Sequence, residues 1–405
     1  QTLRRPTEHK AVTVSSPPEA EPQTVSPPDR SLGAGRIIRA VVVWQLLGLV
    51  AWGLSPAPRF LIAALTGSAL LLLLAEPARV RLLRAAILTF AFGLIWSVGP
   101  SGSQVSIVSH PGLIGAFAGL GALADFALHP ARDHRVNVAG FGVPAFVFVV
   151  ALTLAPIGHG WVVTQDAVLL LADRALGGLP SYAVADAFAA WPPLAAFAWV
   201  AYLTLPLEAS LVLLVSIRRE RADMDSRRIL LACAVAGLLG VLGYWLCPAT
   251  GPRYAFPGFP VRPVGVSLGG ISVAPDFPRN AMPSLHFAWA CILYRAARPV
   301  PWLHWTTLAW LIGIAVAALG FGEHYLIDLV VAVPFLAAVE SALIRRWRWM
   351  LVTVTVAAAW IIYLGRGGGL DPVVGWIAVT GSLVIGLLAL PRRVYGAPAV
   401  LEANA

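Results

Sequence analysis

Long apolar segments with almost no charge recur along this 405-residue chain. Many are about 16–20 residues long, close to the length of helix that crosses the hydrocarbon core of a bilayer. Hydrophobic residues make up 58 % of the chain and charged residues 12 %, whereas soluble domains carry roughly a quarter charged residues. The sequence therefore predicts an all-α, polytopic transmembrane bundle. A β-barrel is disfavoured because the apolar runs are continuous and do not alternate with polar residues.

About twelve segments are expected to span the membrane. They lie near residues 37–54, 60–75, 82–99, 113–128, 140–157, 193–215, 228–246, 283–297, 302–320, 325–343, 349–364 and 372–390. Residues 1–35 are rich in Pro, Ser, Thr and Glu, a composition that predicts a disordered tail. Residues 36–139 are expected to hold N-terminal transmembrane helices, and 346–405 the C-terminal helices and tail.

Basic residues indicate how these spans are oriented. Every second connection is rich in arginine, as in "EPARVRLLR", "PARDHRVN", "IRRERADMDSRR" and "IRRWRWM". Cytoplasmic connections carry such an excess of basic residues, so both termini of this multi-pass cell-membrane protein are expected in the cytoplasm. The net charge of +9 is explained in the same way, and no nucleic-acid partner is expected. The long connections 158–192 and 247–282 then lie on the exoplasmic side.

Three polar segments are expected to meet on the exoplasmic face. The first is "CPATGPRY", with Arg253 after the seventh expected span. The second is "NAMPSLH", with Ser284 and His286 at the start of the eighth span. The third is "GEHYLID", with His324 and Asp328 at the start of the tenth. Two crossings separate the two histidines, so the chain returns to the same side.

These side chains suit phosphoryl transfer. The i, i+4 spacing places His324 and Asp328 on one helix face, where the carboxylate can hold the imidazole in one tautomer. His324 is then a competent nucleophile, and His286 can protonate a leaving oxygen. Arg253 can grip a phosphoryl group, and Ser284 with helix N-termini can cradle its oxygens. No cluster of metal-ligating side chains accompanies them, so neither a metal nor another cofactor is expected.

The same motifs resemble those of a known family. "PSLH" and "GEHYLID" are similar to the second and third signature motifs of the type 2 phosphatidic acid phosphatase superfamily. "CPATGPRY" is similar to the variant first motif of its inositol phosphorylceramide synthase-like branch. The resemblance covers about residues 150–345 and implies a six-helix catalytic core, which we place in residues 140–345. It also implies a nucleophile at His324, its orienting partner at Asp328, an acid at His286, and phosphate ligands at Ser284 and Arg253.

Two positions depart from the phosphatase-type motifs. Ala318 stands where the third motif carries an Arg, and Leu246 stands where the first motif carries a Lys. The phosphate would have fewer cationic ligands, unless Arg262 or Arg279 in the 247–282 connection replaces them. These departures favour the phosphotransferase branch over a simple phosphatase.

Some ionisable residues near the motifs have simpler explanations. Arg253 could be an interfacial anchor, and Glu323 is expected to be a solvated neighbour of His324. Asp166 and Asp173 lie in an amphipathic stretch expected along the membrane surface. They could contact a polar headgroup, but the prediction is that they form the wet face of this helix.

Three functions remain open on the sequence alone. The first is transfer of a phosphorylated polyol, such as inositol phosphate, from a lipid-linked phosphate donor to a lipid or glycan hydroxyl acceptor. The second is hydrolysis of lipid or polyprenyl phosphates. The third is a transporter or a non-catalytic scaffold, which the complete His-Asp pair and the second histidine disfavour.

Overall fold

The computed structural model describes residues 163–218, 224–274, 277, 279–391 and 394–395, together with isolated positions between 84 and 129. The expected tail 1–35 and the five spans expected before residue 158 lie outside these described residues, apart from the isolated positions. The architecture below is that of the described part of the chain.

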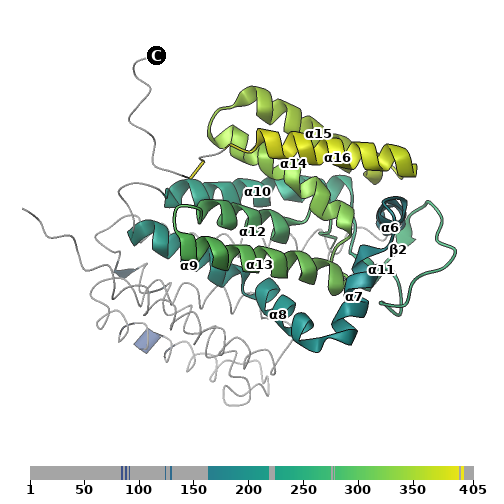
Figure 1. Cartoon of the computed structure of the whole chain (residues 1–405), viewed down its shortest axis with the longest axis horizontal. Coiled ribbons are helices and arrows are strands. Elements are labelled where there is room, and N and C mark those ends of the chain that lie inside the picture. Colours follow the sequence, from purple (N-terminus) through teal and green to yellow (C-terminus); the bar gives the residue numbers. More distant parts are fainter. Residues whose placement is uncertain are drawn as a thin grey trace, which may run out of the picture. The chain divides into compact units, whose positions relative to one another are not determined.

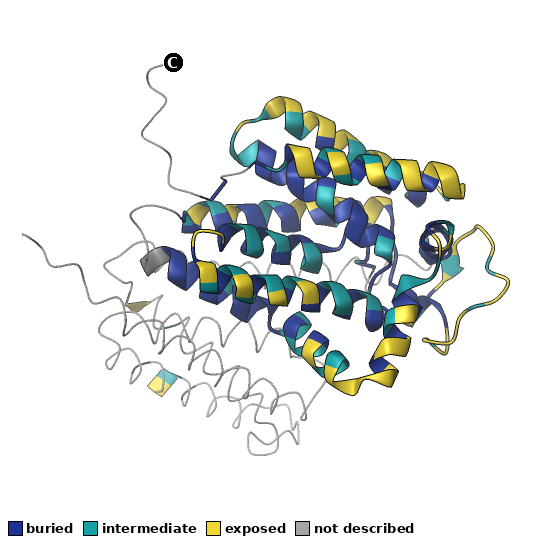
Figure 2. Ribbon diagram, viewed as in Figure 1, coloured by how far each residue is buried: buried dark blue, intermediate teal, exposed yellow. Residues whose placement is uncertain are grey.

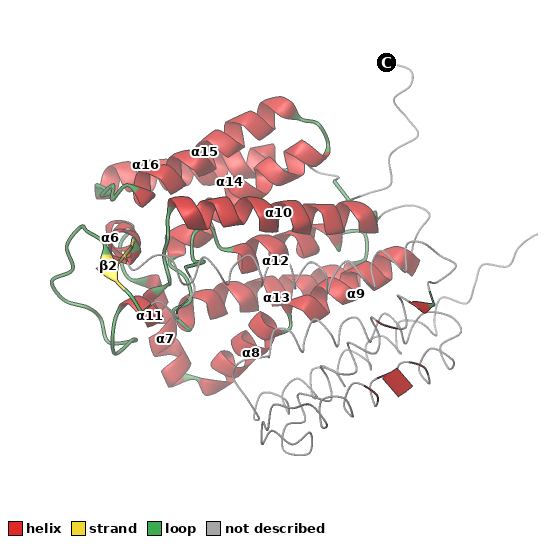
Figure 3. Cartoon of the chain, turned by 180° about the vertical axis from the view of Figure 1, so that it is seen from behind, coloured by secondary structure: helices red, strands yellow, loops and turns green. Residues whose placement is uncertain are grey.

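This part is almost entirely helical (Figures 1 and 3). Its helices, numbered as in Figure 1, are α6 (Asp166–Ala175), α7 (Pro180–Ala190), α8 (Pro192–Leu203), α9 (Leu205–Arg218), α10 (Ser226–Leu246), α11 (Pro252–Ala255), α12 (Leu285–Ala296), α13 (Pro301–Gly320), α14 (Leu326–Leu343), α15 (Trp347–Gly365) and α16 (Pro372–Ala389). Two short strands, β1 (Val163–Thr164) and β2 (Ile271–Ser272), pair antiparallel with Thr164 opposite Ile271.

Five helices, namely α10, α13, α14, α15 and α16, are long and apolar enough to cross a membrane. The bent pairs α6–α7 and α8–α9, with angles of 83° and 59°, raise this number to seven if each pair is one span. The seven spans expected after residue 190 fall on α8–α9, α10 and α12 to α16. α12, with 12 residues, is about 18 Å long and too short to cross by itself. The described residues thus form an all-α, multi-pass membrane bundle.

Local sequence explains where several helices begin. Proline, which lacks the N–H that a first helical turn leaves unpaired, stands at the first position of α7, α8, α11, α13 and α16. Asp225 caps α10 by accepting hydrogen bonds from the backbone N–H groups of Arg227 and Arg228. Asp371 caps α16 in the same way through Val373 and Val374.

α14 is the most deeply buried of the five long helices. It packs against α10, α12, α15 and α16, while α13 packs against α7, α8 and α12. α15 and α16 carry large apolar side chains on their outer faces (Figure 2), including Trp376 at 52 % and Ile377 at 68 % exposure. Such a surface is costly in water and suits contact with lipid chains.

The helix order places the polar motifs at one end of the bundle. α10 ends, and α12 and α14 begin, at the end where Figure 1 shows α6, α7 and α11 gathered. At the opposite end of the bundle, Arg295 lies in the last turn of α12 and Arg346 follows the end of α14. One end of the bundle therefore holds the candidate catalytic groups, and the other holds the arginine-rich connections.

Labelling of introduced cysteines tests the predicted orientation. Ser267 is exposed in the connection before β2, and Arg227 is exposed in the first turn of α10, at the opposite end. A cysteine at position 267 should react with a membrane-impermeant thiol reagent added to intact cells, whereas one at 227 should react only after the cells are opened. The natural chain is the control, because Cys233 and Cys247 are buried and Cys291 is partly buried. The reverse pattern would place the site in the cytoplasm.

Candidate active site

Backbone hydrogen bonds bring the three polar segments together. The amide of Ala281 donates to the carbonyl of Ala249 over 3.0 Å, joining the second segment to the first. The amide of Arg253 donates to Gly322 O over 3.0 Å, joining the first to the third, and Ser284 N donates to Asp328 O over 3.3 Å. Residues up to 69 positions apart in sequence are thus hydrogen-bonded in one backbone cluster at the end of the bundle.

Two glycines permit this close approach. Gly251 has φ +94°, and a Cβ placed there would lie 2.4 Å from the carbonyl oxygen of Glu323. Gly322 has φ +68°, and its Cβ would lie 2.9 Å from the amide nitrogen of Arg253. Any other residue would meet both backbone strain and a clash with the facing loop. The glycines in "CPATG" and "FGEHY" therefore let the first and third segments touch.

His324 is held from four directions. Its backbone N–H donates to Ala318 O over 2.9 Å, and its carbonyl accepts from the Ser181 hydroxyl over 2.9 Å. Its ring Nδ1 lies 2.9 Å from Ala281 O and 3.4 Å from Asp328 Oδ2. Because a carbonyl oxygen can only accept, Nδ1 carries the proton and the Nε2 lone pair is left for chemistry.

The Asp328 carboxylate is fully buried beside this ring. Its Oδ2 accepts a hydrogen bond of 2.8 Å from the amide of Tyr325, at the start of α14. The other oxygen, Oδ1, has no hydrogen-bond partner among the described residues. The carboxylate can therefore stabilise positive charge that develops on His324.

His286 and Ser284 lie at the start of α12, on the second segment. The imidazole of His286 stacks on the Tyr202 ring with centroids 4.2 Å apart, and its Nδ1 lies 3.3 Å from the Tyr202 hydroxyl. His286 is also close enough to His324 for their charges to interact. The Ser284 side chain is fully buried, and its hydroxyl has no hydrogen-bond partner among the described residues. Sequence reasoning did not single out Tyr202, since a tyrosine in an apolar helix carries no distinctive signal.

Arg253 is paired with an acidic residue. Its guanidinium lies 3.6 Å from Glu323 Oε1, and its side chain remains 52 % exposed. Tyr254 donates its hydroxyl to both oxygens of the same carboxylate, over 3.0 and 3.2 Å. Burial raises the pKa of Glu323, while the Tyr254 hydrogen bond, His324 and Arg253 act in the opposite direction. The prediction that Glu323 is a solvated neighbour is wrong, because its side chain is only 18 % exposed and holds Arg253 and Tyr254.

The other two candidate arginines have different partners. The guanidinium of Arg279 is buried and donates to the carbonyls of Val273 and Ala274 over 2.8 Å each, and to Phe277 O. Arg262 is exposed and forms an ion pair with Asp186 on α7. The structure thus brings five of the candidate residues into one region: His324, Asp328, His286, Ser284 and Arg253. Arg279 instead donates hydrogen bonds to carbonyls of its own loop, and Arg262 pairs with α7.

The two departures from the phosphatase-type motifs add no charge to this region. Ala318 is fully buried on α13, and its carbonyl accepts from the amides of Glu323 and His324. Leu246 ends α10 with 53 % of its surface exposed. Among the described residues, no three His, Cys, Asp or Glu side chains are grouped to hold a metal ion.

Comparison with known protein families identifies the region that carries these residues. Residues 167–343 match the model of the PAP2 superfamily. This segment is a PAP2 superfamily domain. Members of the superfamily are typically metal-independent phosphatases or phosphotransferases that act on lipid phosphates. No curated protein and no solved structure gave a match to the chain.

The PAP2 domain extends from α6 to the end of α14, and includes every candidate residue derived from the motifs. α15 and α16 lie beyond it, although both pack on α14. The general superfamily expectation is therefore confirmed for this segment, while the branch, the donor and the acceptor belong to the proposal below.

Asp166 lies one residue before the matched PAP2 segment and was expected on a wet helix face. That prediction is wrong, because its side chain is fully buried. Its carboxylate accepts hydrogen bonds from Thr250 N and Oγ1, from Gly251 N at 2.9 Å, and from the Tyr325 hydroxyl at 2.8 Å. One buried carboxylate thus ties α6 to both the first and the third polar segments.

Asp173 is buried as well, about two turns further along α6. Its two oxygens accept from the amides of Leu326 over 2.8 Å and Ile327 over 3.0 Å. These are the first free N–H groups of α14, the helix that begins directly after His324. The wet-face prediction is wrong here too, and α6 supports the loops of the PAP2 domain that carry the candidate residues.

Replacing Asp166 should destabilise this support. Asp166→Ala leaves buried N–H and O–H donors without a partner, which should cost about 3 kcal/mol and lower the melting temperature by roughly 10 °C. Thermal unfolding of the purified chain in detergent measures this. Asp186→Ala is the matched control, because its exposed ion pair with Arg262 should contribute little. Equal effects of the two changes would contradict the supporting role of Asp166.

Proposed function

We propose that this chain is a membrane-embedded phosphotransferase that moves a phosphorylated headgroup through a phosphohistidine at His324. The observation that carries the proposal is the fixed imidazole. Nδ1 is engaged by Ala281 O and Asp328, so Nε2 is the nitrogen left to attack phosphorus. The PAP2 domain supports the general chemistry, and the geometry supports the assignment of roles.

In the first step, Nε2 of His324 attacks the phosphorus of the lipid donor. An N–P bond forms while the P–O bond to the lipid breaks, and His286 gives a proton to the departing oxygen. Asp328 stabilises the positive charge on the His324 ring. Arg253 and the free hydroxyl of Ser284 hold the phosphoryl oxygens, assisted by the N-terminus of α12.

In the second step, an acceptor hydroxyl takes the place of the departed lipid. His286, now neutral, accepts the hydroxyl proton while the oxygen attacks phosphorus. A new P–O bond forms, the N–P bond breaks, and both histidines return to their starting protonation states. Water in place of the acceptor would complete hydrolysis, which is the alternative function.

The charge balance of the site favours transfer over hydrolysis. Arg253 is neutralised in part by Glu323, Arg262 is paired with Asp186, and positions 246 and 318 carry no charge. When few cations hold the phosphoryl group, its transfer depends more on an acceptor that the site orients. Such orientation can lower the activation free energy by several kcal/mol. We further propose a polyol phosphate such as inositol phosphate as the transferred group, since Tyr254 and Glu323 offer hydrogen-bonding groups beside Arg253.

The site is proposed to face the exoplasmic side, where donor and acceptor lipids enter from the outer leaflet. The alternation of basic connections supports this orientation. The cysteine-labelling experiment above tests it independently of activity.

Product analysis separates transfer from hydrolysis. The purified protein in detergent is incubated with phosphatidylinositol or with phosphatidic acid, each with and without a lipid alcohol acceptor. A new phosphodiester should form only when phosphatidylinositol and the acceptor are both present. Phosphatidic acid alone should release little inorganic phosphate, because bound water lacks the positioning that the acceptor supplies. Phosphorus NMR and lipid mass spectrometry follow both products.

Rapid acceptor-independent phosphate release that is lost in His286→Ala would instead establish a phosphatase. Absence of both products and of any phosphorylated protein, with every donor, would support the non-catalytic class.

A further inference from the structure

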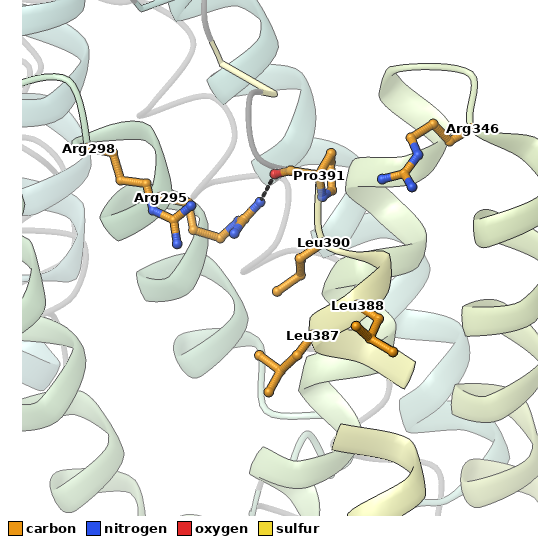
Figure 4. A pocket seen from close by; sticks show the side chains of 7 residues that line it. All are labelled: Arg295, Arg298, Arg346, Leu387, Leu388, Leu390 and Pro391. Atoms are coloured by element: carbon orange, nitrogen blue, oxygen red, sulfur yellow. Dashed lines mark hydrogen bonds between the residues drawn. The ribbon is translucent and has the colours of Figure 1, made fainter. Parts of the chain in front are cut away.

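A basic pocket lies at the end of the bundle away from the catalytic residues. It has a volume of about 490 Å³, and Figure 4 shows the side chains that line it. Its lining comes from the end of α12, the turn between α14 and α15, and the end of α16: Arg295, Arg298, Arg346, Leu387, Leu388, Leu390 and Pro391. α14 has 18 residues, so about 27 Å of helix separates this end from His324.

Arg295 is a fixed part of the pocket wall. Its side chain is 8 % exposed and its guanidinium lies 2.7 Å from the fully buried carboxylate of Glu340. It also donates to Pro391 O over 2.6 Å, the bond drawn in Figure 4, and Tyr395 donates to Glu340 over 2.8 Å. This network ties α12 to α14 and to the segment after α16. The charge of Arg295 is therefore balanced by Glu340.

The other two arginines bring positive charge without such balance. Neither Arg298 nor Arg346 forms an ion pair with a carboxylate in the described part of the chain. Arg298 is exposed and lies over the Tyr294 ring, 5.9 Å from its centroid. Arg346 is half-buried, donates one N–H to Ala389 O over 3.1 Å and lies 5.7 Å from the Trp349 ring centroid. Most of their N–H donors are left for a ligand.

An apolar surface adjoins these charges. Leu387 and Leu388, in the last turn of α16, are 63 % and 65 % exposed. Figure 4 shows them with Leu390 beneath the arginines, with Arg298 on one side of Pro391 and Arg346 on the other. The pocket is thus positively charged at the end of the helices and apolar along the helix toward the membrane interior.

We propose that this pocket binds the phosphate headgroup of an anionic phospholipid in the leaflet opposite the catalytic site. The anionic headgroup binds against the guanidinium groups of Arg298 and Arg346, and an acyl chain follows Leu387 and Leu388 along α16. Guanidinium groups suit phosphate oxygens, and basic pockets between transmembrane helices bind anionic headgroups. A free anion would satisfy the arginines but not the leucines. The proposal does not depend on the function proposed above.

Native mass spectrometry and thermal unfolding of the full-length protein in nanodiscs test the proposal. The discs contain phosphatidylcholine alone or with phosphatidylglycerol. The natural chain should retain phosphatidylglycerol and melt at a higher temperature when it is present. Arg298→Gln/Arg346→Gln should weaken this binding about thirty-fold, since each basic residue near an anionic lipid contributes roughly a factor of five. Arg295 is left unchanged because Glu340 would otherwise be buried without a partner.

Arg348→Gln/Arg366→Gln is the matched control. It removes the same charge from two exposed residues outside the pocket, and should change phosphatidylglycerol binding by less than about twofold. The double variant could itself be less stable, which a lower melting temperature in phosphatidylcholine alone would show. In that case the single variant Arg298→Gln is used instead, because position 298 is exposed. Unchanged phosphatidylglycerol binding in the pocket variant, or equal losses in pocket and control variants, would overturn the proposal. So would equal stabilisation by inorganic phosphate, which would show that the ligand is a soluble anion.

Discussion

Replacing His324 with alanine is expected to leave less than about one percent of the natural turnover, because removal of a nucleophile typically costs several orders of magnitude. The imidazole is held by Ala281 and Asp328, and its Nε2 is free. The bonds that hold the loop around position 324 are made by its backbone, to Ala318 and Ser181. The variant should therefore insert and purify normally.

A chemical signature accompanies the loss of turnover. The natural chain, quenched during reaction with labelled donor, should carry an acid-labile phosphoryl group that is missing from His324→Ala. His304→Ala is the control, because His304 lies at the start of α13, at the other end of the bundle, stacked on Tyr294. Full activity or retained labelling in His324→Ala would assign the nucleophile elsewhere.

Asp328→Asn is expected to lower turnover by about 10²–10⁴-fold, as a loss of charge beside a catalytic histidine does. Asparagine matches aspartate in size and can still accept the hydrogen bond from Tyr325 N. What it removes is the negative charge 3.4 Å from His324 Nδ1, which in the proposed mechanism stabilises the ring as the phosphohistidine forms. Single-turnover kinetics should show slower phosphorylation of His324 with little change in donor binding.

This substitution also separates catalysis from helix capping. Asparagine and aspartate cap helices about equally well, so a purely structural Asp328 would tolerate the change. Asp371→Asn, at the capped start of α16, provides the comparison and should be close to neutral in both stability and turnover. Natural activity in Asp328→Asn would mean that its carboxylate only caps α14.

The helices could be predicted because each one depends on a local pattern. The expected spans 228–246, 302–320 and 372–390 differ by only a few residues from α10, α13 and α16. Length and hydropathy are properties of a continuous segment, and a lipid environment requires such segments to pair their own backbone groups as helices. In the structure, prolines and aspartates mark where several of these helices begin.

The motif residues could be placed on a common face because each follows a span of known direction. His286 and His324 are separated by two crossings, so topology returns them to the same end of the bundle. Their spacing to Ser284 and Asp328 is short enough for helix geometry alone to set the relation.

The supporting residues could not be identified in this way. Asp166 and Asp173 are typical of the wet face of an amphipathic helix, yet both are buried and hydrogen-bond backbone groups 84 to 154 residues away in sequence. Glu323 was predicted to be solvated, yet it holds Arg253 and Tyr254. A carboxylate is buried only when the fold supplies enough donors to replace its hydration. Those donors come from other segments of the chain, so no local sequence pattern predicts that these carboxylates are buried.

For this protein, the sequence by itself determined the all-α membrane architecture, the end of the bundle at which the motifs meet, and the identity of the His-Asp pair. Each of these depends on hydropathy or on spacings within one helix. Only the tertiary structure decided that Nδ1 of His324 is engaged and Nε2 is free, that Arg262 pairs with Asp186, and that α6 supports the loops that carry the candidate residues. These features depend on which distant groups share a buried space, because hydrogen bonds and ion pairs act only over a few ångströms.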